Sequence, residues 1–399
     1  MKILVVSQCF YPETFRINEL CFNLVNEGHS VTVLTGYPNY PEGYIYPEYK
    51  DKKIKRETIN GVDVIRVNMS ERKTGSARLF LNYVTYALSA GFKTFSLDKD
   101  YDAVFVFQTS PVTQILPAWL YKVRCKKPIA VNCQDIWPDV VKVRGLKEGT
   151  LIFNMVKAAS AWLYKRADII VNTSPGFANY LNTVCGIEPS KMLCLPSFAE
   201  DFYLEFGNKS AEDNRLHLLF AGNIGQAQSL DTVVGAVAKL NEEKRKQLMI
   251  DILGDGSYLE ELKGLVEQNA LSDCFTFHGR KPATELRDYY ELADGYLLTL
   301  EGNSPLSLTI PAKLQGYMGA GKPILAAING GAADVIADAD CGRRVPAGDA
   351  EGLAGLMEEM LASNDHFASL GVIGKIYFIN NFTLDKYTKD LIKILEELK

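Results

Sequence analysis

Short runs of consecutive apolar residues alternate along this chain with segments in which apolar residues recur every three or four positions. The runs are rich in Val and Ile and are not interrupted by polar residues, which is typical of parallel strands covered on both faces. A helical segment at 16–28 separates the first two runs and ends at Gly28, a residue type favoured just past a helix. The alternation predicts a doubly wound α/β sheet. In the first half, strands are predicted at 2–7, 30–35, 62–68, 103–108, 128–133 and 168–172.

The alternation breaks after about residue 196 and then restarts. Residues 201–215 are polar and irregular, and they predict a linker. Beyond the linker the pattern is again that of an α/β domain. Strands are predicted there at 216–221, 248–253, 274–278, 295–299 and 323–327. Helices are predicted at 229–246, 257–269, 283–292 and 311–320.

Length and composition fit two folded domains. The 399 residues suit two cores of ordinary size better than one. Apolar residues make up 47% and charged residues 23%, as in an ordinary cytosolic enzyme. A last helix is predicted at 384–398. We therefore predict one domain over 1–200 and a second over 201–383, with residues 384–399 crossing back to the first.

Charge and hydropathy exclude several classes of protein. The net charge of −5 gives no reason to expect nucleic acid as a partner. No run of about 18 apolar residues occurs, so no membrane span is predicted. The amino-terminal segment 1–6 carries one positive charge and soon meets Ser7 and Gln8, so it is interpreted as a buried strand rather than a signal peptide. We expect a cytoplasmic protein.

The cysteines and histidines suggest no special chemistry. The eight cysteines form no Cys-x-x-Cys pair, and we expect buried, reduced thiols rather than a disulfide framework or a structural zinc. The four histidines are scattered along the chain, so neither a catalytic dyad nor a metal site is predicted. The cysteines are Cys9, Cys21, Cys125, Cys133, Cys185, Cys194, Cys274 and Cys341.

Two loops of the first half are candidates for ligand binding, because each follows a predicted strand, and ligands of doubly wound folds bind at the carboxyl ends of strands. The loop at 11–18 lacks the Gly-x-Gly-x-x-Gly pattern of a dinucleotide site. Arg16 could bind a phosphate from there, with Asn18 beside it, although a solvated arginine in a first helical turn is the alternative. Asp135 follows strand 128–133 and is interpreted as a cleft residue, or alternatively as a helix N-cap.

In the second half, residues 221–229 open the new α/β unit. Gly222 permits a ligand to approach the backbone closely, and free amides at the start of the next helix form an anion site to which Asn223 and Gln226 could add. A Gly-x-x-Gly spacing alone is a weak signal. Arg280 follows another strand end, where a nucleobase could be bound.

Lys313 stands in the first turn of the predicted helix 311–320, after Pro311. A cation is unfavourable at a helix start, so an external diphosphate would explain it, while a solvated lysine is the ordinary alternative. Ser307, Thr309 and Gln315 flank it and are further candidates for binding the same ligand.

With these segments in view, the chain resembles glycosyltransferase family four, the retaining GT-B enzymes, over nearly its full length. It is most similar to transferases of O-antigen and capsule clusters, including those that use N-acetylfucosamine and related amino-deoxysugars. The segments that carry the resemblance are the Tyr-Pro-Glu loop at 11–13, Gln134 to Pro138, Ser197 to Tyr203, Ala221 to Gln228, and Ile310 to Lys313 through Gly321-Lys322-Pro323.

The resemblance implies two Rossmann-like domains around a deep cleft, with a UDP-sugar donor held mainly by the second domain. It implies transfer with retention, without a metal or other cofactor, in which the leaving diphosphate helps to deprotonate the acceptor. Asp135 would lie near the anomeric carbon. Lys313 and the amides near Asn223 would bind the diphosphate, and a stabilised leaving oxyanion contributes several kcal/mol to catalysis in general.

Two positions depart from the family pattern. Many members carry two glutamates eight positions apart, and these positions are Leu308 and Gly316 here, so the usual ribose-binding carboxylate is missing. Gln315 or Glu301 could substitute, but neither is in register. Many members also have a lysine in place of Gln228, which would shift the binding of phosphate to Lys313.

The acceptor is expected to be a lipid-linked saccharide. Segment 72–93 mixes basic and apolar residues, a pattern that can lie on an anionic bilayer at the inner face of the membrane. A helix packed on the sheet with solvated arginines is the alternative. Other functions left open are a UDP-sugar 2-epimerase, a non-catalytic subunit that binds a sugar nucleotide, and, least favoured, an NAD-dependent dehydrogenase.

Overall fold

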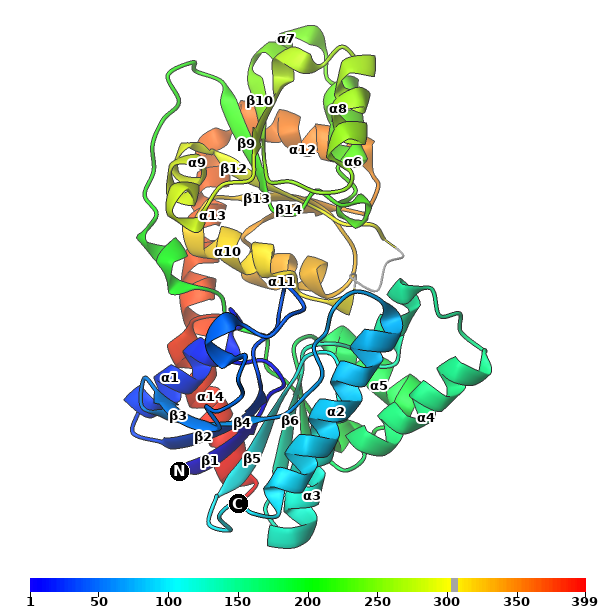
Figure 1. The fold of residues 1–399 in the computed structure, drawn as a ribbon. Helices are drawn as coiled ribbons and strands as arrows, with labels where there is room; N and C mark the ends of the chain where they lie inside the picture. The colour runs from blue at the N-terminus through cyan, green and yellow to red at the C-terminus, as the bar shows by residue number, and fades with distance from the viewer. Residues whose placement is uncertain (303–307) are drawn as a thin grey trace. The chain divides into compact units, whose positions relative to one another are not determined.

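The structure is a computed structural model and describes residues 1–302 and 308–399. The chain forms two compact units. Unit 1 consists of residues 1–195 and 387–399, and unit 2 consists of residues 196–386, where the sequence predicted changes of domain at 200 and 384. Each unit is an α/β fold built on its own sheet, so the predicted fold class is confirmed (Figure 1).

Unit 1 contains an eight-stranded sheet in the order β3-β4-β2-β1-β5-β6-β7-β8, parallel except between β3 and β4. Its central strands are buried on both faces, which explains why they are uninterrupted apolar runs in the sequence. The strands are β1 (Lys2–Val6), β2 (Ser30–Gly36), β3 (Arg56–Ile59), β4 (Val62–Val67), β5 (Ala103–Gln108), β6 (Ile129–Cys133), β7 (Ile169–Asn172) and β8 (Met192–Cys194). The helices are α1 (Ile17–Asn26), α2 (Ser76–Thr94), α3 (Ile115–Cys125), α4 (Leu151–Tyr164) and α5 (Pro175–Cys185).

The edge strand β3 was not predicted from the sequence. It is mostly polar, with exposed and half-buried positions alternating, because it lies at the edge of the sheet. Asn60 and Gly61 join it to β4, and both have positive φ angles, of 47° and 81°. This is the backbone of a tight hairpin turn, and Asn-Gly is the dipeptide that signals it.

The last helix, α14 (Leu384–Glu397), contributes to unit 1 (Figure 1). Its inner face buries Leu391 and Leu395 completely. The amide of Asn23 in α1 donates a hydrogen bond to the Thr388 hydroxyl over 3.0 Å. The ammonium of Lys399 lies 2.6 Å from the Asp102 carboxylate beside β5. Residues far apart in sequence therefore complete one fold.

Unit 2 contains a six-stranded, fully parallel sheet in the order β11-β10-β9-β12-β13-β14. The strands are β9 (Leu216–Ala221), β10 (Leu248–Leu253), β11 (Phe275–Gly279), β12 (Gly295–Thr299), β13 (Ile324–Ala327) and β14 (Gly342–Val345). The helices are α6 (Asp231–Lys239), α7 (Glu242–Lys246), α8 (Leu259–Gln268), α9 (Leu286–Leu292), α10 (Ala312–Ala320), α11 (Gly331–Ala339), α12 (Ala350–Ala362) and α13 (Asn364–Asn381).

The unit 2 sheet separates two apolar cores, because successive strand residues point to opposite faces. Leu218 and Phe220 of β9 face the core formed with α6, α8 and α12. Leu219 and Ala221 face the core formed with α9, α10 and α11. The central strands are thereby fixed from both sides, and so are the loops at their carboxyl ends.

The predicted helix at 229–246 is wrong, because the structure has two helices there. Helix α6 ends at Lys239, and Leu240 is extended, with ψ at 146°. The side chain of Asn241 then accepts a hydrogen bond from the Lys244 amide over 2.9 Å and caps α7. A capping asparagine satisfies the amides of a new helix start better than it supports a continuous helix.

The predicted linker at 201–215 is partly ordered against unit 2. Residues Asp201–Glu205 form a short 3-10 helix, η5. The ring of Tyr203 lies 5.5 Å from those of Phe206 and Tyr290, measured between centroids. The segment is polar in sequence, but these aromatic rings anchor it to the unit 2 core.

The eight cysteines are all free thiols, and six of them are buried. Cys125 is half-buried and Cys194 is exposed on the edge strand β8, so the predicted burial is wrong at these two positions. Within residues 1–302 and 308–399, no helix combines the length and the apolar character needed to cross a membrane.

Glycines allow two loops of unit 2 to approach each other at backbone distance. A β-carbon on Gly254, whose φ is 145°, would lie 1.8 Å from the carbonyl oxygen of Gly222. A β-carbon on Gly256 would lie 2.2 Å from the carbonyl oxygen of Ile224. The amides of Gly222 and Ile224 donate to the carbonyls of Leu253 and Asp255. The loops after β9 and β10 are thus fixed to each other.

We expect Gly254→Ala to lower the free energy of unfolding of unit 2 by roughly 3 kcal/mol or more. An alanine there would have a backbone conformation that favours glycine, and its β-carbon would also overlap the carbonyl oxygen of Gly222. Urea denaturation followed by circular dichroism measures the change. Gly264→Ala in α8 is the matched control, since a β-carbon there meets no atom within 4 Å. It should raise stability by up to about 1 kcal/mol. Equal effects of the two changes would contradict the proposed loop packing.

Candidate active site

The carboxyl edge of the unit 2 sheet brings several predicted residues together. Strand β9 lies between β10 and β12, so the strand order reverses beside it. Ligands of open α/β sheets bind outside the carboxyl ends of the strands at such a reversal. The loop after β9 lies at this edge, and α10, which follows β12, brings Lys313 to the same place.

Lys313 is half-buried, and its ammonium lies against backbone and an aromatic ring. It lies 4.0 Å from the centroid of the Phe220 ring and donates a hydrogen bond to Gln228 Oε1. A β-carbon on Gly222 would lie 3.3 Å from it. Burial lowers the pKa of Lys313 to about 7. Among the described residues no carboxylate forms an ion pair with this ammonium, so an incoming anion would supply its counter-charge.

The loop at 222–228 offers fewer free amides than the sequence suggested. The amides of Gly222 and Ile224 donate to the carbonyls of Leu253 and Asp255, so neither is a free donor for an anion. No described residue accepts a hydrogen bond from the amides of Asn223 and Gly225. The side chains of Asn223 and Gln226 are exposed. An anion here would meet these two amides and Lys313.

The remaining predicted residues of unit 2 lie in different environments. Arg280 is exposed just past β11, and Thr309 is half-buried shortly before α10. Gln315 is only 1% exposed, and its amide donates to the Ser197 carbonyl, so ligand binding would require that bond to be exchanged. Ser307 lies outside the described residues. Glu301 is exposed, and its backbone amide donates to the Ala227 carbonyl over 3.0 Å.

An aromatic ring fills the space beside Gly316, one of the two positions that depart from the family pattern. A β-carbon there would lie 2.9 Å from Cζ of Tyr203. Tyr203 stacks on Phe202 with ring centroids 4.3 Å apart. A carboxylate at position 316 is therefore excluded by the packing of η5 as well as absent from the sequence. The pairing of Gly316 with Tyr203 joins distant segments, and a single sequence carries no signal for it.

In unit 1, Asp135 lies directly after β6 and binds back to the end of β5. Its Oδ2 accepts hydrogen bonds from the Ser110 amide over 2.7 Å and from the Ser110 hydroxyl over 2.6 Å. The indole of Trp137 donates to the same hydroxyl over 3.2 Å. The N-cap alternative for Asp135 is therefore wrong. Among the described residues none donates to Oδ1, which stays open to an external hydroxyl.

The loop after β1 is organised by a buried carboxylate that sequence reasoning missed. Glu13 accepts hydrogen bonds from the amides of Phe10, Asn39 and Tyr40. Burial raises the pKa of Glu13, although these bonds act to lower it. Asn18 is also buried and bridges the Tyr11 amide and the Glu13 carbonyl, so it closes the loop.

Arg16, the other candidate in this loop, is half-buried and immediately precedes α1. Its predicted contact with a phosphate stays a prediction. The other two candidates of unit 1 differ in their contacts, since Asn18 closes the loop around Glu13 and Asp135 binds Ser110 with one carboxylate oxygen.

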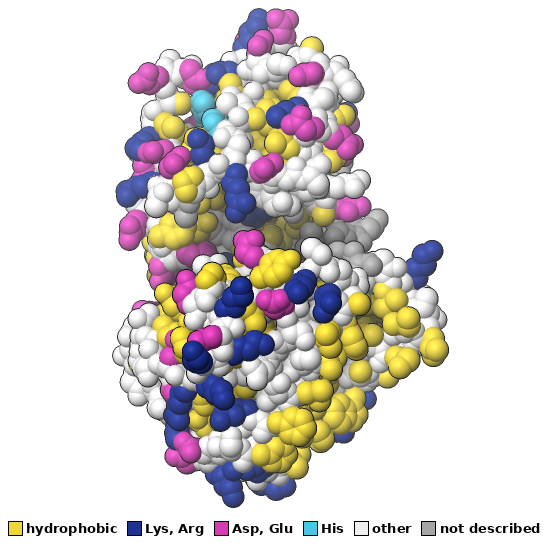
Figure 2. Space-filling model, in the orientation of Figure 1, with side chains coloured by type: hydrophobic (Ala, Val, Ile, Leu, Met, Phe, Trp, Pro, Cys, Tyr) yellow, Lys and Arg dark blue, Asp and Glu magenta, His cyan; other side chains and the backbone are white. Residues whose placement is uncertain are grey.

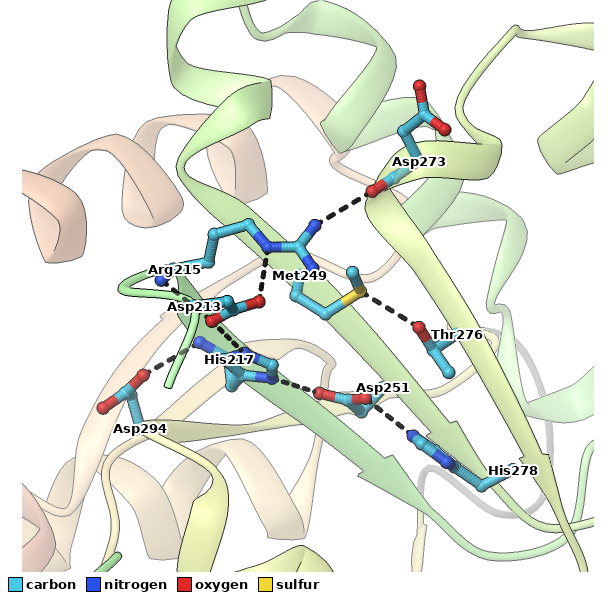
Figure 3. A network of polar contacts seen from close by, with 9 residues as sticks. All are labelled: Asp213, Arg215, His217, Met249, Asp251, Asp273, Thr276, His278 and Asp294. Atoms are coloured by element: carbon cyan, nitrogen blue, oxygen red, sulfur yellow. Dashed lines mark hydrogen bonds and ion pairs between the residues drawn. The ribbon is translucent and has the colours of Figure 1, made fainter. Parts of the chain in front are cut away.

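Two of the three histidines of unit 2 share a polar network, although the sequence suggested that the histidines are scattered. Strands β9, β10 and β11 place His217, Asp251 and His278 in one row (Figure 3). His217 Nδ1 lies 2.7 Å from Asp251 Oδ2, and His278 Nε2 lies 2.7 Å from Asp251 Oδ1. His217 Nε2 lies 3.0 Å from Asp213 Oδ1. Because the register of neighbouring strands creates the row, the spacing of the residues in sequence did not indicate it.

Both ring nitrogens of His217 face carboxylate oxygens, which accept but do not donate hydrogen bonds. The bond to Asp251, assisted by that to Asp213, raises the pKa of His217. Burial acts to raise the pKa of Asp251, but its two imidazole partners lower it overall. Among the described residues no group of three or more His, Cys, Asp or Glu side chains is arranged to hold a metal ion. The network is therefore best explained as a set of charged hydrogen bonds that hold the segment before β9 against the sheet.

Comparisons with known proteins identify relatives of both units. Residues 14–197 match the family model described as glycosyl transferase 4-like domain, and residues 204–376 match that of glycosyl transferases group 1. The probable glycosyltransferase WbjE of Pseudomonas aeruginosa is 25% identical over 283 residues, 66% of this chain and 68% of that protein.

A second relative is the putative colanic acid biosynthesis glycosyl transferase WcaI of Escherichia coli K12, 23% identical over 343 residues, 80% of this chain and 82% of that protein. Among solved structures, Anabaena HepE in complex with UDP superposes with a TM-score of 0.70, covering 100% of both chains at 14% identity. At that identity the likeness shows the fold alone.

We expect His217→Gln to reduce the free energy of opening of β9 by about 1 kcal/mol at pH 6, because it removes a charged hydrogen-bond donor. Because the pKa of His217 is raised in the folded protein, its contribution to stability is complete below the unfolded-state pKa of about 6.5. That contribution is lost as pH rises through the pKa of the folded state. Hydrogen exchange of the β9 and β10 amides, measured from pH 6 to pH 8.5, follows this loss.

The variant should therefore differ from the wild type at pH 6 and converge with it as pH rises. His366→Gln, at an exposed histidine of α13, is the matched control and should change neither profile. A constant difference at all pH values would mean that the contribution of His217 does not depend on its charge.

Proposed function

This chain belongs to glycosyltransferase family four, with the GT-B fold, and we propose that it transfers a sugar from a UDP-sugar to a lipid-linked saccharide during the synthesis of a surface polysaccharide. WcaI is named for colanic acid biosynthesis, which supports the polysaccharide. HepE binds UDP on the same fold, which supports the nucleotide. The resemblance to amino-deoxysugar transferases supports an N-acetylated hexosamine or amino-deoxysugar as the transferred group.

The observation that carries the proposal is the ammonium of Lys313 at the strand-order reversal of unit 2. It is half-buried, lacks a carboxylate partner among the described residues, and lies beside a glycine that leaves room for a ligand. A diphosphate is doubly suited to this place, because it neutralises the cation and accepts hydrogen bonds from the loop amides. Lys313 would therefore bind the leaving group.

In the proposed reaction the bond between the anomeric carbon and the diphosphate oxygen breaks, and a bond to the acceptor hydroxyl oxygen forms. The acceptor attacks from the face that the diphosphate leaves, so the sugar keeps its anomeric configuration, and the hydroxyl proton passes to the leaving diphosphate. Lys313 stabilises the negative charge that develops on the diphosphate. Asp135, with Oδ1 open, orients the reacting groups as a hydrogen-bond acceptor.

We propose that unit 1 contacts the membrane through the outer faces of α2 and α4. Hydrophobic side chains gather there (Figure 2), including Phe92, which is 74% exposed, and Leu151, which is 77% exposed. Arg78 is exposed in the first turn of α2 and could pair with anionic headgroups. A contact of this kind would bring a lipid-linked acceptor to the enzyme.

A non-catalytic subunit that binds a sugar nucleotide is the second candidate, because Tyr203 occupies the place of the usual ribose-binding carboxylate. Such a protein would bind the donor without hydrolysing or transferring it. A 2-epimerase would convert the donor in the absence of any acceptor. Incubation of donor with and without acceptor, followed by chromatography of the nucleotide products, separates the three functions.

We expect Lys313→Ala to weaken UDP binding by roughly 1.5–3 kcal/mol, the range for charge-assisted hydrogen bonds. In the wild type, UDP affinity should fall by up to about tenfold for each pH unit between 7 and 9, because binding requires a proton on a lysine whose free pKa is about 7. Isothermal titration calorimetry in buffers of different ionisation enthalpy measures both the affinity and the proton uptake.

Lys322→Ala is the matched control for this experiment. Burial also lowers the pKa of Lys322, but this residue precedes β13 at the opposite edge of the sheet. The control should bind UDP like the wild type and keep its pH dependence. Unchanged UDP affinity in Lys313→Ala would mean that Lys313 does not bind the nucleotide. Tighter binding of GDP than of UDP would mean that the donor carries guanine rather than uracil.

We expect more protein to sediment with anionic than with neutral liposomes, because basic and apolar side chains act together at such a surface. The double variant Phe92→Ser, Leu151→Ser should reduce recovery with anionic liposomes. Ile376→Ser on α13 is the control, at an apolar residue of unit 2 that is also exposed. Equal recovery with both lipids at low salt would exclude the proposed membrane contact.

A further inference from the structure

Unit 1 contains a partly open cavity of about 550 Å³, and apart from Asp135 its lining has no part in the proposed reaction. It lies among α2, α4, the short 3-10 helix η3 (Asp139–Arg144), and the loops that follow β5 and β6. Its walls are mainly aliphatic and aromatic. They include Leu79, Tyr83, Val84, Val140, Val156 and Leu163. A space of this size is in the usual range for a small-molecule site.

The few polar groups of the cavity are unevenly distributed. Asp135 lines it, but Oδ2 of this carboxylate is already bonded to Ser110. Arg72 also lines it and lies over the Tyr40 ring, 5.1 Å from the centroid. Hydroxyl groups of Ser and Thr side chains also line it, but they are a minority beside the aliphatic and aromatic side chains. The lining suits a hydrocarbon that carries an anionic group near Arg72.

The cavity lies next to the exposed apolar surface of unit 1. Phe80 lines the cavity and is also 68% exposed. On α4, Val156 lines the cavity, while Ile152, one turn earlier, and Met155, the preceding residue, are exposed. The same two helices therefore present apolar side chains both into the cavity and to the outer surface, and Figure 2 shows apolar side chains on that surface. A chain anchored in a lipid surface could pass from that surface into the cavity without crossing a polar barrier.

We propose that this cavity binds the first part of the hydrocarbon chain of a lipid phosphate acceptor, with Arg72 binding its phosphate. The inference rests on the proposed function, since it concerns the lipid part of the acceptor. Charge complementarity favours this occupant over a neutral lipid, because Arg72 is a cation in the lining, while the carboxylate of Asp135 in the same lining already accepts two hydrogen bonds from Ser110. The lipid then contributes to the binding of the acceptor, and only residues of unit 1 contact the lipid.

Farnesyl diphosphate, used below the concentration at which it forms micelles, tests the proposal in the full-length protein. Titrations are made with saturating UDP, so that the phosphate site of unit 2 is occupied. Calorimetry should show that farnesyl diphosphate binds at least about tenfold more tightly than inorganic pyrophosphate, because only the former buries a hydrocarbon. Farnesol should bind more weakly than farnesyl diphosphate.

Two variants locate the binding site. Val156→Phe fills the cavity and should weaken farnesyl diphosphate binding by about tenfold or more, since the chain and the added ring compete for one space. Arg72→Gln should weaken farnesyl diphosphate binding by about tenfold but leave farnesol binding unchanged, because it removes only the charge-assisted bond. Val123→Phe, at an exposed residue of α3 outside the cavity, is the matched control and should bind like the wild type.

UDP affinity separates this inference from the proposed function. All three variants should bind UDP like the wild type, because the residues changed belong to unit 1. Absence of UDP binding in the wild type would overturn the proposed function. Intact UDP binding with equal affinity of Val156→Phe and Val123→Phe for farnesyl diphosphate would overturn the lipid cavity only. Palmitate binding as tightly as farnesyl diphosphate, with no effect of Arg72→Gln, would overturn it too and indicate a fatty-acid site.

Discussion

The proposed chemistry depends on one ammonium group that is partly removed from water without a described carboxylate to compensate it. Lys313 is brought to the carboxyl edge of the unit 2 sheet by α10, where burial lowers its pKa to about 7. Proteins rarely bury a cation without a counter-charge, because the desolvation is costly. Within the described residues the only recorded hydrogen-bond partner of this ammonium is Gln228. The natural counter-charge is a ligand.

The surrounding architecture keeps that arrangement rigid. Two apolar cores hold the unit 2 sheet from both faces, and glycines let the loops after β9 and β10 meet backbone to backbone. In unit 1 the buried carboxylate of Glu13 organises the loop after β1, while Ser110 orients Asp135. Both sheets therefore place their polar groups on loops whose backbone is fixed by packing. Pre-organisation of this kind is what a group-transfer site requires.

Some of these features could be predicted from the sequence and others could not. The central strands were predicted because burial on both faces gives uninterrupted apolar runs. Strands β3, β8 and β14 were missed because they are short and lie at sheet edges. Lys313 was indicated by its unfavourable place at a helix start. The row formed by His217, Asp251 and His278 was missed, because only strand register brings the three together. Tyr203 beside Gly316 was missed for the same reason, since contacts between distant segments leave no local pattern.

The path of the chain through the two units has a consequence for synthesis. Unit 2 consists of consecutive residues, whereas unit 1 begins with the first strand and ends with most of α14. On the ribosome, the nascent polypeptide exposes the groove destined for α14 during the whole time in which residues 196–386 are made. Leu391 and Leu395 can cover that groove only after those residues have been made. Unit 2 can thus mature before the unit that precedes it.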